Sequence, residues 1–178
     1  MIEFSRPLVM GILNLTPDSF YDGGKYADVQ LVVERVKTML VEGADIIDIG
    51  AMSSRPGATI ISEEEELERL LPVLEVLRKQ FPKTVFSVDT FRSAVARQAI
   101  KNGADIINDI SAGTQDEQMF QAIADLQVPY IMMHMQGTPE TMQKNPEYNG
   151  VIKEIGTFFA RQIEKLKKTI PTPRQRMN

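Results

Sequence analysis

The feature that most constrains the fold is a seven-residue pattern that occurs twice. The segment Glu42-Gly43-Ala44-Asp45-Ile46-Ile47-Asp48 is echoed by Asn102-Gly103-Ala104-Asp105-Ile106-Ile107-Asn108. In both copies a glycine follows a stretch of helical periodicity and precedes a short apolar run. Glycine is favoured in the left-handed position after the last turn of a helix, and the apolar run can then enter a sheet at once. The repeat predicts two helix-to-strand junctions of one design, with Asp48 and Asn108 at equivalent strand ends.

Short apolar runs alternate with longer amphipathic stretches along the rest of the chain. Strands are expected at Leu8–Leu13, Asp45–Ile49, Thr84–Val88, Ile106–Asn108 and Pro129–Met133. Helices are expected at about Val29–Glu42, Glu63–Gln80, Arg92–Asn102, Asp116–Leu126 and Val151–Lys168. Strands that alternate with helices are typical of βα units around a parallel sheet.

Polar residues follow the expected strands, so they should gather at the face where barrels and open α/β sheets place their sites. A complete (β/α)8 barrel takes about 250 residues, whereas this chain has 178. We therefore expect an α/β fold of the (β/α)8 TIM-barrel type, truncated to about five βα units. The last ten residues contain Pro171 and Pro173 and do not predict a sixth strand, because proline lacks the N–H that a strand donates.

Composition excludes several classes of function. An apolar content of 43% predicts one globular domain, and a net charge of -4 without a basic stripe gives no indication of nucleic-acid binding. Cysteine is absent, which excludes disulfides and thiolate chemistry and makes the cytoplasm the default compartment. The run Leu8–Leu13 is too short for a membrane span or a secretory signal. We expect neither nucleic acid nor membrane as a partner.

Two loops carry groups that suit a phosphorylated ligand. The side chain of Asn14 could ligate a hard cation or donate to an anion, or it could simply close a turn. Arg55, beside Ser54 and Pro56, offers a planar set of donors for phosphate oxygens. Its alternative is an ordinary solvated arginine.

Two later strand ends carry groups that suit a nitrogen heterocycle. Asp89 could accept paired N–H bonds from a guanidine-like ring edge, although Asp89 or Thr90 could instead cap the following helix. Asn108 could contact the same ring edge or stabilise a turn. Ile110 and Met133 could pack on the ring faces or belong to the core.

His134 is the only histidine, which excludes sites built from several histidines. It could contact a substrate beside Met133. Alternatively, it is a strand-end residue satisfied by the backbone.

Four segments together resemble dihydropteroate synthase, a folate-pathway enzyme family. They are Gly11–Phe20, Ser53–Ala58, Ser87–Thr90 and Ile107–Ile110. The resemblance runs from about Leu8 to about Lys168, and it implies a partial pterin-binding TIM barrel in residues 1–168. Residues 169–178 lie outside the resemblance, and their two prolines and few apolar residues predict a disordered tail. The family usually has Gly-Gly-Glu-Ser-Thr-Arg-Pro-Gly where this chain has Gly-Ala-Met-Ser-Ser-Arg-Pro-Gly.

The resemblance implies a role for each candidate residue. Asn14 would contact Mg²⁺ and the substrate diphosphate, and Ser54 and Arg55 would bind phosphate oxygens. The pterin would be held by Asp89, Asn108, Ile110 and Met133. The 4-aminobenzoate would be covered by Phe20 and Pro56.

The implied reaction condenses 6-hydroxymethyl-7,8-dihydropterin diphosphate with 4-aminobenzoate to give 7,8-dihydropteroate and diphosphate, without a protein nucleophile. The family also uses residues from later strands that have no matching position here, so an inactive fragment is one alternative. A pterin-binding methyltransferase-like domain is another. We expect small-molecule partners, and a homodimer where the complete barrel is present.

Overall fold

The computed structural model describes residues 5–15, 25–52, 60–138, 141–142 and 145–170. Strands and helices alternate along these residues in the order β1 (Met10–Asn14), α2 (Lys25–Val41), β2 (Ile46–Gly50), α3 (Glu63–Gln80), β3 (Val85–Asp89), α4 (Ser93–Lys101), β4 (Ile106–Asp109), α5 (Met119–Leu126), β5 (Tyr130–Met132) and α6 (Val151–Thr169). The strands form a parallel sheet in the order β1-β2-β3-β4-β5. The predicted succession of five βα units is confirmed.

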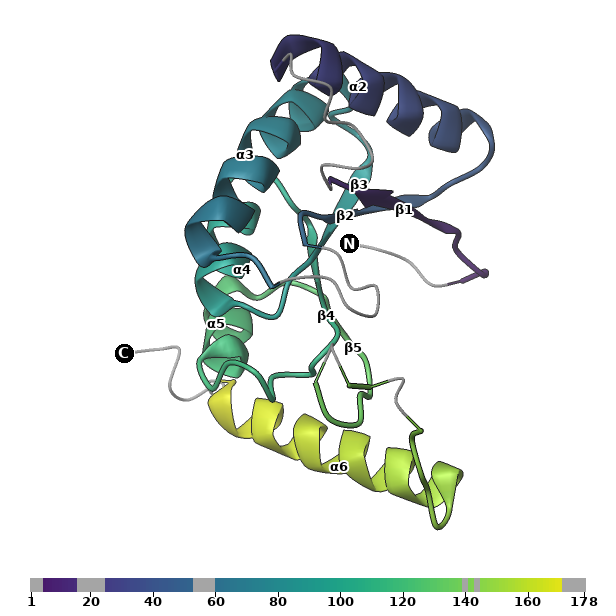
Figure 1. Ribbon diagram of the computed structural model, residues 1–178, viewed down its shortest axis with the longest axis vertical. Helices are drawn as coiled ribbons and strands as arrows, with labels where there is room; N and C mark the ends of the chain where they lie inside the picture. Colours follow the sequence, from purple (N-terminus) through teal and green to yellow (C-terminus); the bar gives the residue numbers. More distant parts are fainter. Residues whose placement is uncertain (1–4, 16–24, 53–59, 139–140, 143–144, 171–178) are drawn as a thin grey trace.

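All the helices lie on one side of the sheet. Figure 1 shows α2, α3, α4, α5 and α6 following one another in a crescent, with the strands on its concave side. No described helix covers the other face of the sheet. This is the arrangement of a barrel wall, in which helices form the outer layer and the opposite sheet face lines the interior.

The repeated glycines form the predicted junctions. Gly43 has φ 107° and Gly103 has φ 106°, a left-handed conformation that favours glycine. The next residue in each copy closes the helix end: the Ala44 N–H bonds to the Met39 carbonyl at 2.9 Å, and the Ala104 N–H bonds to the Ala99 carbonyl at 3.0 Å. These are the long bonds of a Schellman motif.

The aspartates of the repeat have a structural role that the sequence did not predict. Asp45 accepts a 2.9 Å bond from the Val9 N–H, and Asp105 accepts a 2.9 Å bond from the Phe86 N–H. An arginine neutralises each carboxylate, Arg6 at Asp45 and Arg78 at Asp105. Each repeat copy therefore ties the start of its strand to the preceding strand. These bonds lie at the amino-terminal end of the strands, opposite to the carboxyl end where the site is expected.

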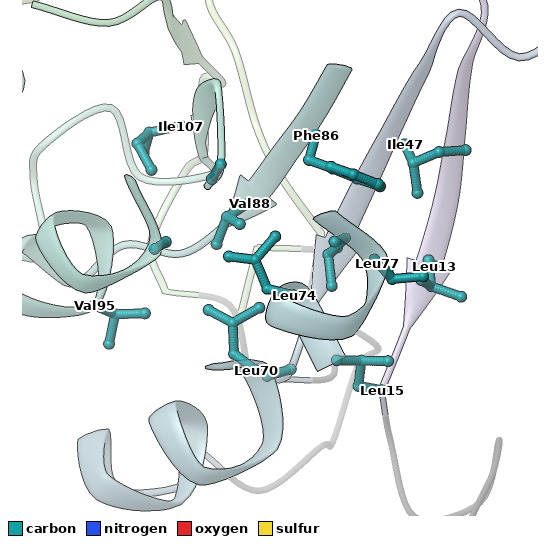
Figure 2. Close-up of a cluster of buried hydrophobic side chains, with 14 of the residues drawn as sticks. Leu13, Leu15, Ile47, Leu70, Leu74, Leu77, Phe86, Val88, Val95 and Ile107 are labelled. Carbon is teal, nitrogen blue, oxygen red and sulfur yellow. The ribbon is translucent and has the colours of Figure 1, made fainter. Parts of the chain in front are cut away.

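The hydrophobic core lies between the sheet and the helices. Alternate strand residues point outward, and they pack against α3 and its neighbours (Figure 2). The buried set includes Leu13, Ile47, Ile49, Phe86, Val88 and Ile107 from the strands and Leu70, Leu74 and Leu77 from α3. Each such side chain contributes about 1.5–3 kcal/mol when fully buried. This core fixes which face of each strand is left for the interior.

Several element boundaries differ from the prediction. Strands β1 and β3 each extend one residue further, to Asn14 and Asp89, because these residues are still paired across the sheet. Helix α5 starts at Met119 and not at Asp116. The Asp116 carboxylate is used instead to accept bonds from the Ser93 N–H at 2.7 Å and the Gln118 N–H at 2.8 Å.

Helices α2, α4 and α6 also begin or end a few residues from the expected positions, at Lys25, Ser93 and Thr169. None of the described helices is long and apolar enough to cross a membrane.

Candidate functional site

Residues of four strands form one row across the carboxyl end of the sheet. Asn14 pairs in register with Gly50, Gly50 with Asp89, and Asp89 with Asn108. Residues paired in register on neighbouring strands point to the same face of a sheet. Three residues predicted separately from the sequence, Asn14, Asp89 and Asn108, are therefore brought together on the interior face.

Gly50 separates the side chains of Asn14 and Asp89. A Cβ atom at this position would lie 3.3 Å from Asn14 Oδ1 and 3.6 Å from Asp89 Oδ2. The absence of a side chain leaves space between the amide of Asn14 and the carboxyl of Asp89. Gly50 cannot be singled out from the sequence, because its effect depends on the two neighbouring strands.

The carboxyl of Asp89 has the most strongly shifted pKa among the acids of the site. Burial, together with the negative charges of Asp48, Glu66 and Asp109, raises its pKa from 3.8 to about 7. Its carboxyl group makes no hydrogen bond with the described side chains or backbone. A carboxylate that is desolvated and lacks a donor is stabilised strongly by a ligand that supplies N–H groups.

The capping alternative for Asp89 is not what the structure shows. Helix α4 begins after Arg92 without a side-chain cap from that residue. The Thr90 hydroxyl accepts a 3.2 Å bond from the Arg92 N–H, and Asp116 reaches the Ser93 N–H from another loop. Asp89 is thereby left to the interior face.

Asp48 lies beneath Asn108 on the same face. The Asn108 Nδ2 atom donates to Asp48 Oδ2 at 3.0 Å. Burial raises the pKa of Asp48, an effect that the neighbouring Ser87 hydroxyl and Asn108 amide oppose. The other oxygen of Asp48, Oδ1, is buried without a hydrogen-bond partner among the described residues, as is Ser87 Oγ.

The expectation that Asp48 and Asn108 occupy equivalent strand ends is wrong. In the sheet Asp48 pairs with Ser87, and Ser87 pairs with Ile106, whereas Asn108 is level with Gly50. The strands are staggered, as the closure of a barrel requires. Asp48 therefore lies one layer deeper than Asn108, and the two side chains face each other along the interior instead of standing side by side.

A third acid, Asp109, organises the loop after β4. It is fully buried and accepts bonds from the Ser111 N–H at 2.7 Å, the Ser111 hydroxyl at 2.7 Å, the Gly113 N–H at 2.8 Å and the Tyr130 hydroxyl at 2.6 Å. Burial and the Asp109 charge raise the pKa of Tyr130 well above its ordinary value. The network fixes the turn that holds Ile110.

Ile110 and Met133 lie at neighbouring strand ends. Ile110 is buried directly after β4. Met133 is half-buried directly after β5, and its N–H bonds to the Asp109 carbonyl at 3.1 Å. Ile110 is therefore close to Asn108 in the chain, and Met133 is brought close to it by the pairing of β4 with β5. Phe20, Ser54, Arg55 and Pro56 lie outside the described residues.

A buried ion pair supports the sheet behind Asp89. Glu66 of α3 is almost fully buried and pairs with Arg92, which also donates to the Ile61 carbonyl at 2.6 Å. Removing one partner of such a pair leaves a buried charge uncompensated. A sequence scan misses Glu66 because it is one of four consecutive glutamates, and only packing distinguishes it from the others.

His134 lies away from the row, against α6. Its ring packs edge-on to Phe158, with centroids 4.8 Å apart, and tilted to Tyr148 at 5.9 Å. It lines an open hollow of about 480 Å³ together with the first turns of α6. Among the described residues it makes aromatic contacts and not the expected backbone hydrogen bond.

No group of three or more acidic or histidine side chains among the described residues could enclose a metal ion. The one predicted ligand, Asn14, is exposed at the end of β1. Mg²⁺ commonly keeps several waters and binds through one or two protein oxygens and substrate phosphates. A single exposed amide oxygen fits that mode of binding, and it does not fit a closed protein site.

Comparison with known protein families finds a match to the pterin binding enzyme family over residues 10–173. The chain is 56% identical over 168 residues to the folate synthesis bifunctional protein of Arabidopsis thaliana, covering 92% of this chain and 35% of that protein. It is 44% identical over 164 residues to the dihydropteroate synthase of Escherichia coli, covering 92% of this chain and 57% of that enzyme.

Among solved structures, the dihydropteroate synthase of Xanthomonas albilineans with 4-aminobenzoic acid has a TM-score of 0.83 and 42% identity. The match covers 96% of this chain and 60% of that one. The five βα units thus correspond to part of a longer TIM-barrel chain, in keeping with the predicted fold. The chain spans little more than half the length of these single-function relatives.

Proposed function

Because the chain belongs to the pterin binding enzyme family, we propose that it acts as a dihydropteroate synthase, a transferase of folate biosynthesis. The reaction would join 6-hydroxymethyl-7,8-dihydropterin diphosphate to 4-aminobenzoate and release diphosphate. The observation that supports this best is the carboxyl of Asp89, which is desolvated and lacks a donor beside Asn108. The names of the relatives, which include dihydropteroate synthases, point the same way.

Asp89 and Asn108 would hold the pterin by its donor-rich edge. The pyrimidinone ring of a pterin presents an amino group and a ring N–H side by side, which match the two oxygens of one carboxylate. Binding would replace the missing solvation of Asp89 with two hydrogen bonds. Ile110 and Met133 would contact the apolar faces of the ring from the adjacent strand ends.

Asn14 would lie at the other end of the substrate. The row of paired residues places its exposed amide one strand beyond Gly50, where the diphosphate of a pterin held by Asp89 could extend. Ser54 and Arg55 would bind further phosphate oxygens, and Phe20 and Pro56 would cover the 4-aminobenzoate. These four roles rest on the family resemblance.

The reaction would be a substitution at the pterin's exocyclic methylene. The bond between that carbon and the diphosphate oxygen breaks and leaves a cationic pterin, the arylamine nitrogen then forms a new bond to the carbon, and the nitrogen loses its extra proton to solvent. The chain's residues would orient the two substrates and bind the departing diphosphate. When bound at Asn14 and the phosphates, Mg²⁺ would supply positive charge that stabilises the leaving group. No protein side chain would need to form a covalent bond.

The cellular setting is part of the same proposal. A chain without cysteine suits the cytoplasm, and its partners would be the two small-molecule substrates. A homodimer is proposed only for a chain that carries the complete barrel.

The proposal is tested first by binding. The purified chain is titrated with 6-hydroxymethylpterin, and ligand fluorescence reports the bound fraction; saturable binding that Asp89→Asn weakens at least tenfold is expected. Dihydropteroate formation with Mg²⁺ and both substrates is then measured. Binding without turnover would favour the alternative of a catalytically impaired fragment. Absence of any binding by a folded chain would refute the proposed function.

A further inference from the structure

The contact between Asp48 and Asn108 bears on which atoms of the Asn108 amide are left for a ligand to contact. The Asn108 Nδ2 atom lies 3.0 Å from Asp48 Oδ2, and Asp48 is only 5% exposed. The bond runs between two layers of the sheet interior, because Asp48 is level with Ser87 and Asn108 is level with Asp89. Asp48 thus reaches Asn108 from beneath the row that faces the ligand.

An ionised carboxylate can only accept hydrogen bonds. The amide group of Asn108 must therefore turn its NH₂ toward Asp48, and this leaves the amide oxygen for other partners. None of the described residues donates to that oxygen. Its neighbour in register, Asp89, also presents acceptor oxygens only when its carboxyl is ionised. Asn108 and Asp89 would then both present hydrogen-bond acceptors to the ligand.

We propose that Asp48 is a positioning residue, which holds the Asn108 amide in one orientation and so makes the site select a ring edge rich in N–H donors. The inference rests on the proposed function, since it concerns the pterin-binding part of that site. Asp48 itself would not touch the pterin. It would act by preventing the Asn108 amide from rotating by half a turn and presenting its NH₂.

This role predicts a specific discrimination between two rings of almost equal size and shape. A pterin carries an amino group at the position where 2,4-dioxopteridine, known as lumazine, carries a carbonyl oxygen. Two acceptors facing that oxygen leave polar groups unpaired, which is a strong basis for rejection. An Asn108 amide that could rotate would donate to the carbonyl and tolerate lumazine.

The experiment compares the ratio of the two dissociation constants in the full chain and in Asp48→Asn. An asparagine at this position can donate as well as accept, so it no longer dictates the orientation of Asn108. We expect the wild-type chain to prefer pterin over lumazine at least tenfold, and Asp48→Asn to reduce that preference by about tenfold. Both ligands are titrated into one preparation, so a reduced folded fraction lowers both signals equally and leaves the ratio unchanged.

Asp125→Asn is the matched control. Asp125 is an exposed residue of α5 that pairs with Arg97, and the substitution should leave the ratio as in the wild type. Asp48→Ala serves as a second variant should Asp48→Asn fail to fold, and it should also reduce the preference.

The outcomes separate this inference from the proposed function. Wild-type binding of pterin with an unchanged ratio in a folded Asp48 variant would overturn the positioning role and leave the pterin site intact. A folded wild-type chain that binds neither ring would overturn the proposed function and this inference with it.

Discussion

The Gln162 side chain donates a 2.6 Å hydrogen bond from Nε2 to the backbone carbonyl of Ala112. Gln162 is fully buried in α6, and Ala112 has a φ of 50° in the loop after β4. The bond thus links the last described helix to the same loop that Asp109 organises. It holds a backbone conformation that alanine rarely adopts.

Gln162→Ala should destabilise the fold. The substitution leaves the Ala112 carbonyl buried without a partner, and such a loss costs about 1–3 kcal/mol. Urea unfolding followed by circular dichroism measures the change in the free energy of unfolding. Gln98→Ala, at an exposed position of α4, is the control and should stay within about 0.5 kcal/mol of the wild type. Equal stability of the two variants would show that the Gln162 bond contributes nothing.

Asp89→Asn should weaken pterin binding and stabilise the protein above neutral pH. The folded-state pKa of about 7 exceeds the ordinary value of 3.8, so the unfolded chain loses its proton first and stability falls as the pH rises between these values. The cost above pH 7 is at most about 4 kcal/mol. Urea unfolding at pH 8 should show the variant to be more stable. A destabilised variant would contradict this account and show that the Asp89 carboxyl stabilises the fold.

Pterin affinity should rise with pH in the wild-type chain and level off above about pH 7. The ionised carboxylate is the form that accepts two N–H bonds, and below its pKa each pH unit should weaken binding by up to about tenfold. Titration of 6-hydroxymethylpterin between pH 5.5 and 8.5, about the range over which this carboxyl changes charge, gives the profile. Asp89→Asn should flatten it. A profile that keeps its slope in the variant would assign the titration to another group.

Gly50→Ala should reduce ligand binding with little loss of stability. The added methyl group would lie 3.3 Å from Asn14 Oδ1 and would fill the space beside Asp89. We expect about a tenfold loss of pterin affinity, equivalent to about 1.4 kcal/mol. Gly156→Ala in α6 is the control, because a Cβ there meets no atom within 4 Å; it should leave binding unchanged and raise helix stability by up to about 1 kcal/mol. Unchanged affinity in Gly50→Ala would mean that the ligand does not use this space.

Tyr130→Phe should destabilise the protein by about 1.5–3 kcal/mol, the usual worth of a hydrogen bond to a charged group. The lost bond joins the Tyr130 hydroxyl to the buried Asp109 carboxylate at 2.6 Å. Thermal and urea unfolding measure the effect. Tyr148→Phe provides the comparison, since the described contact of Tyr148 is made by its ring with His134. Similar stabilities would argue that water replaces the lost donor.

The local features of the chain could be predicted from its sequence. The two glycine junctions, the alternation of strands and helices, and the polar residues at strand ends depend on neighbours within a few positions. Gly43 and Gly103 have the left-handed φ that the repeat predicts. Asn14, Asp89 and Asn108 could also be singled out individually, because polar side chains directly after buried strands indicate the site edge of a parallel sheet.

The contacts between residues of different strands depend on the register of the sheet, which cannot be read from the sequence. The repeat makes Asp48 and Asn108 look equivalent, yet the stagger of the strands sets Asp48 one layer deeper, where it faces Asn108. Tertiary structure likewise places Gly50 between Asn14 and Asp89 and brings the charge of Glu66 close to Asp89. It also brings Gln162 into hydrogen-bonding distance of the Ala112 carbonyl.

Each of these relationships joins residues that are far apart in the chain, and each depends on register and side-chain packing. Sequence patterns determine which face of an element is apolar and where that element ends. Only the tertiary structure determines which polar groups then share one buried space, because the free energy of a buried charge depends on every element that surrounds it.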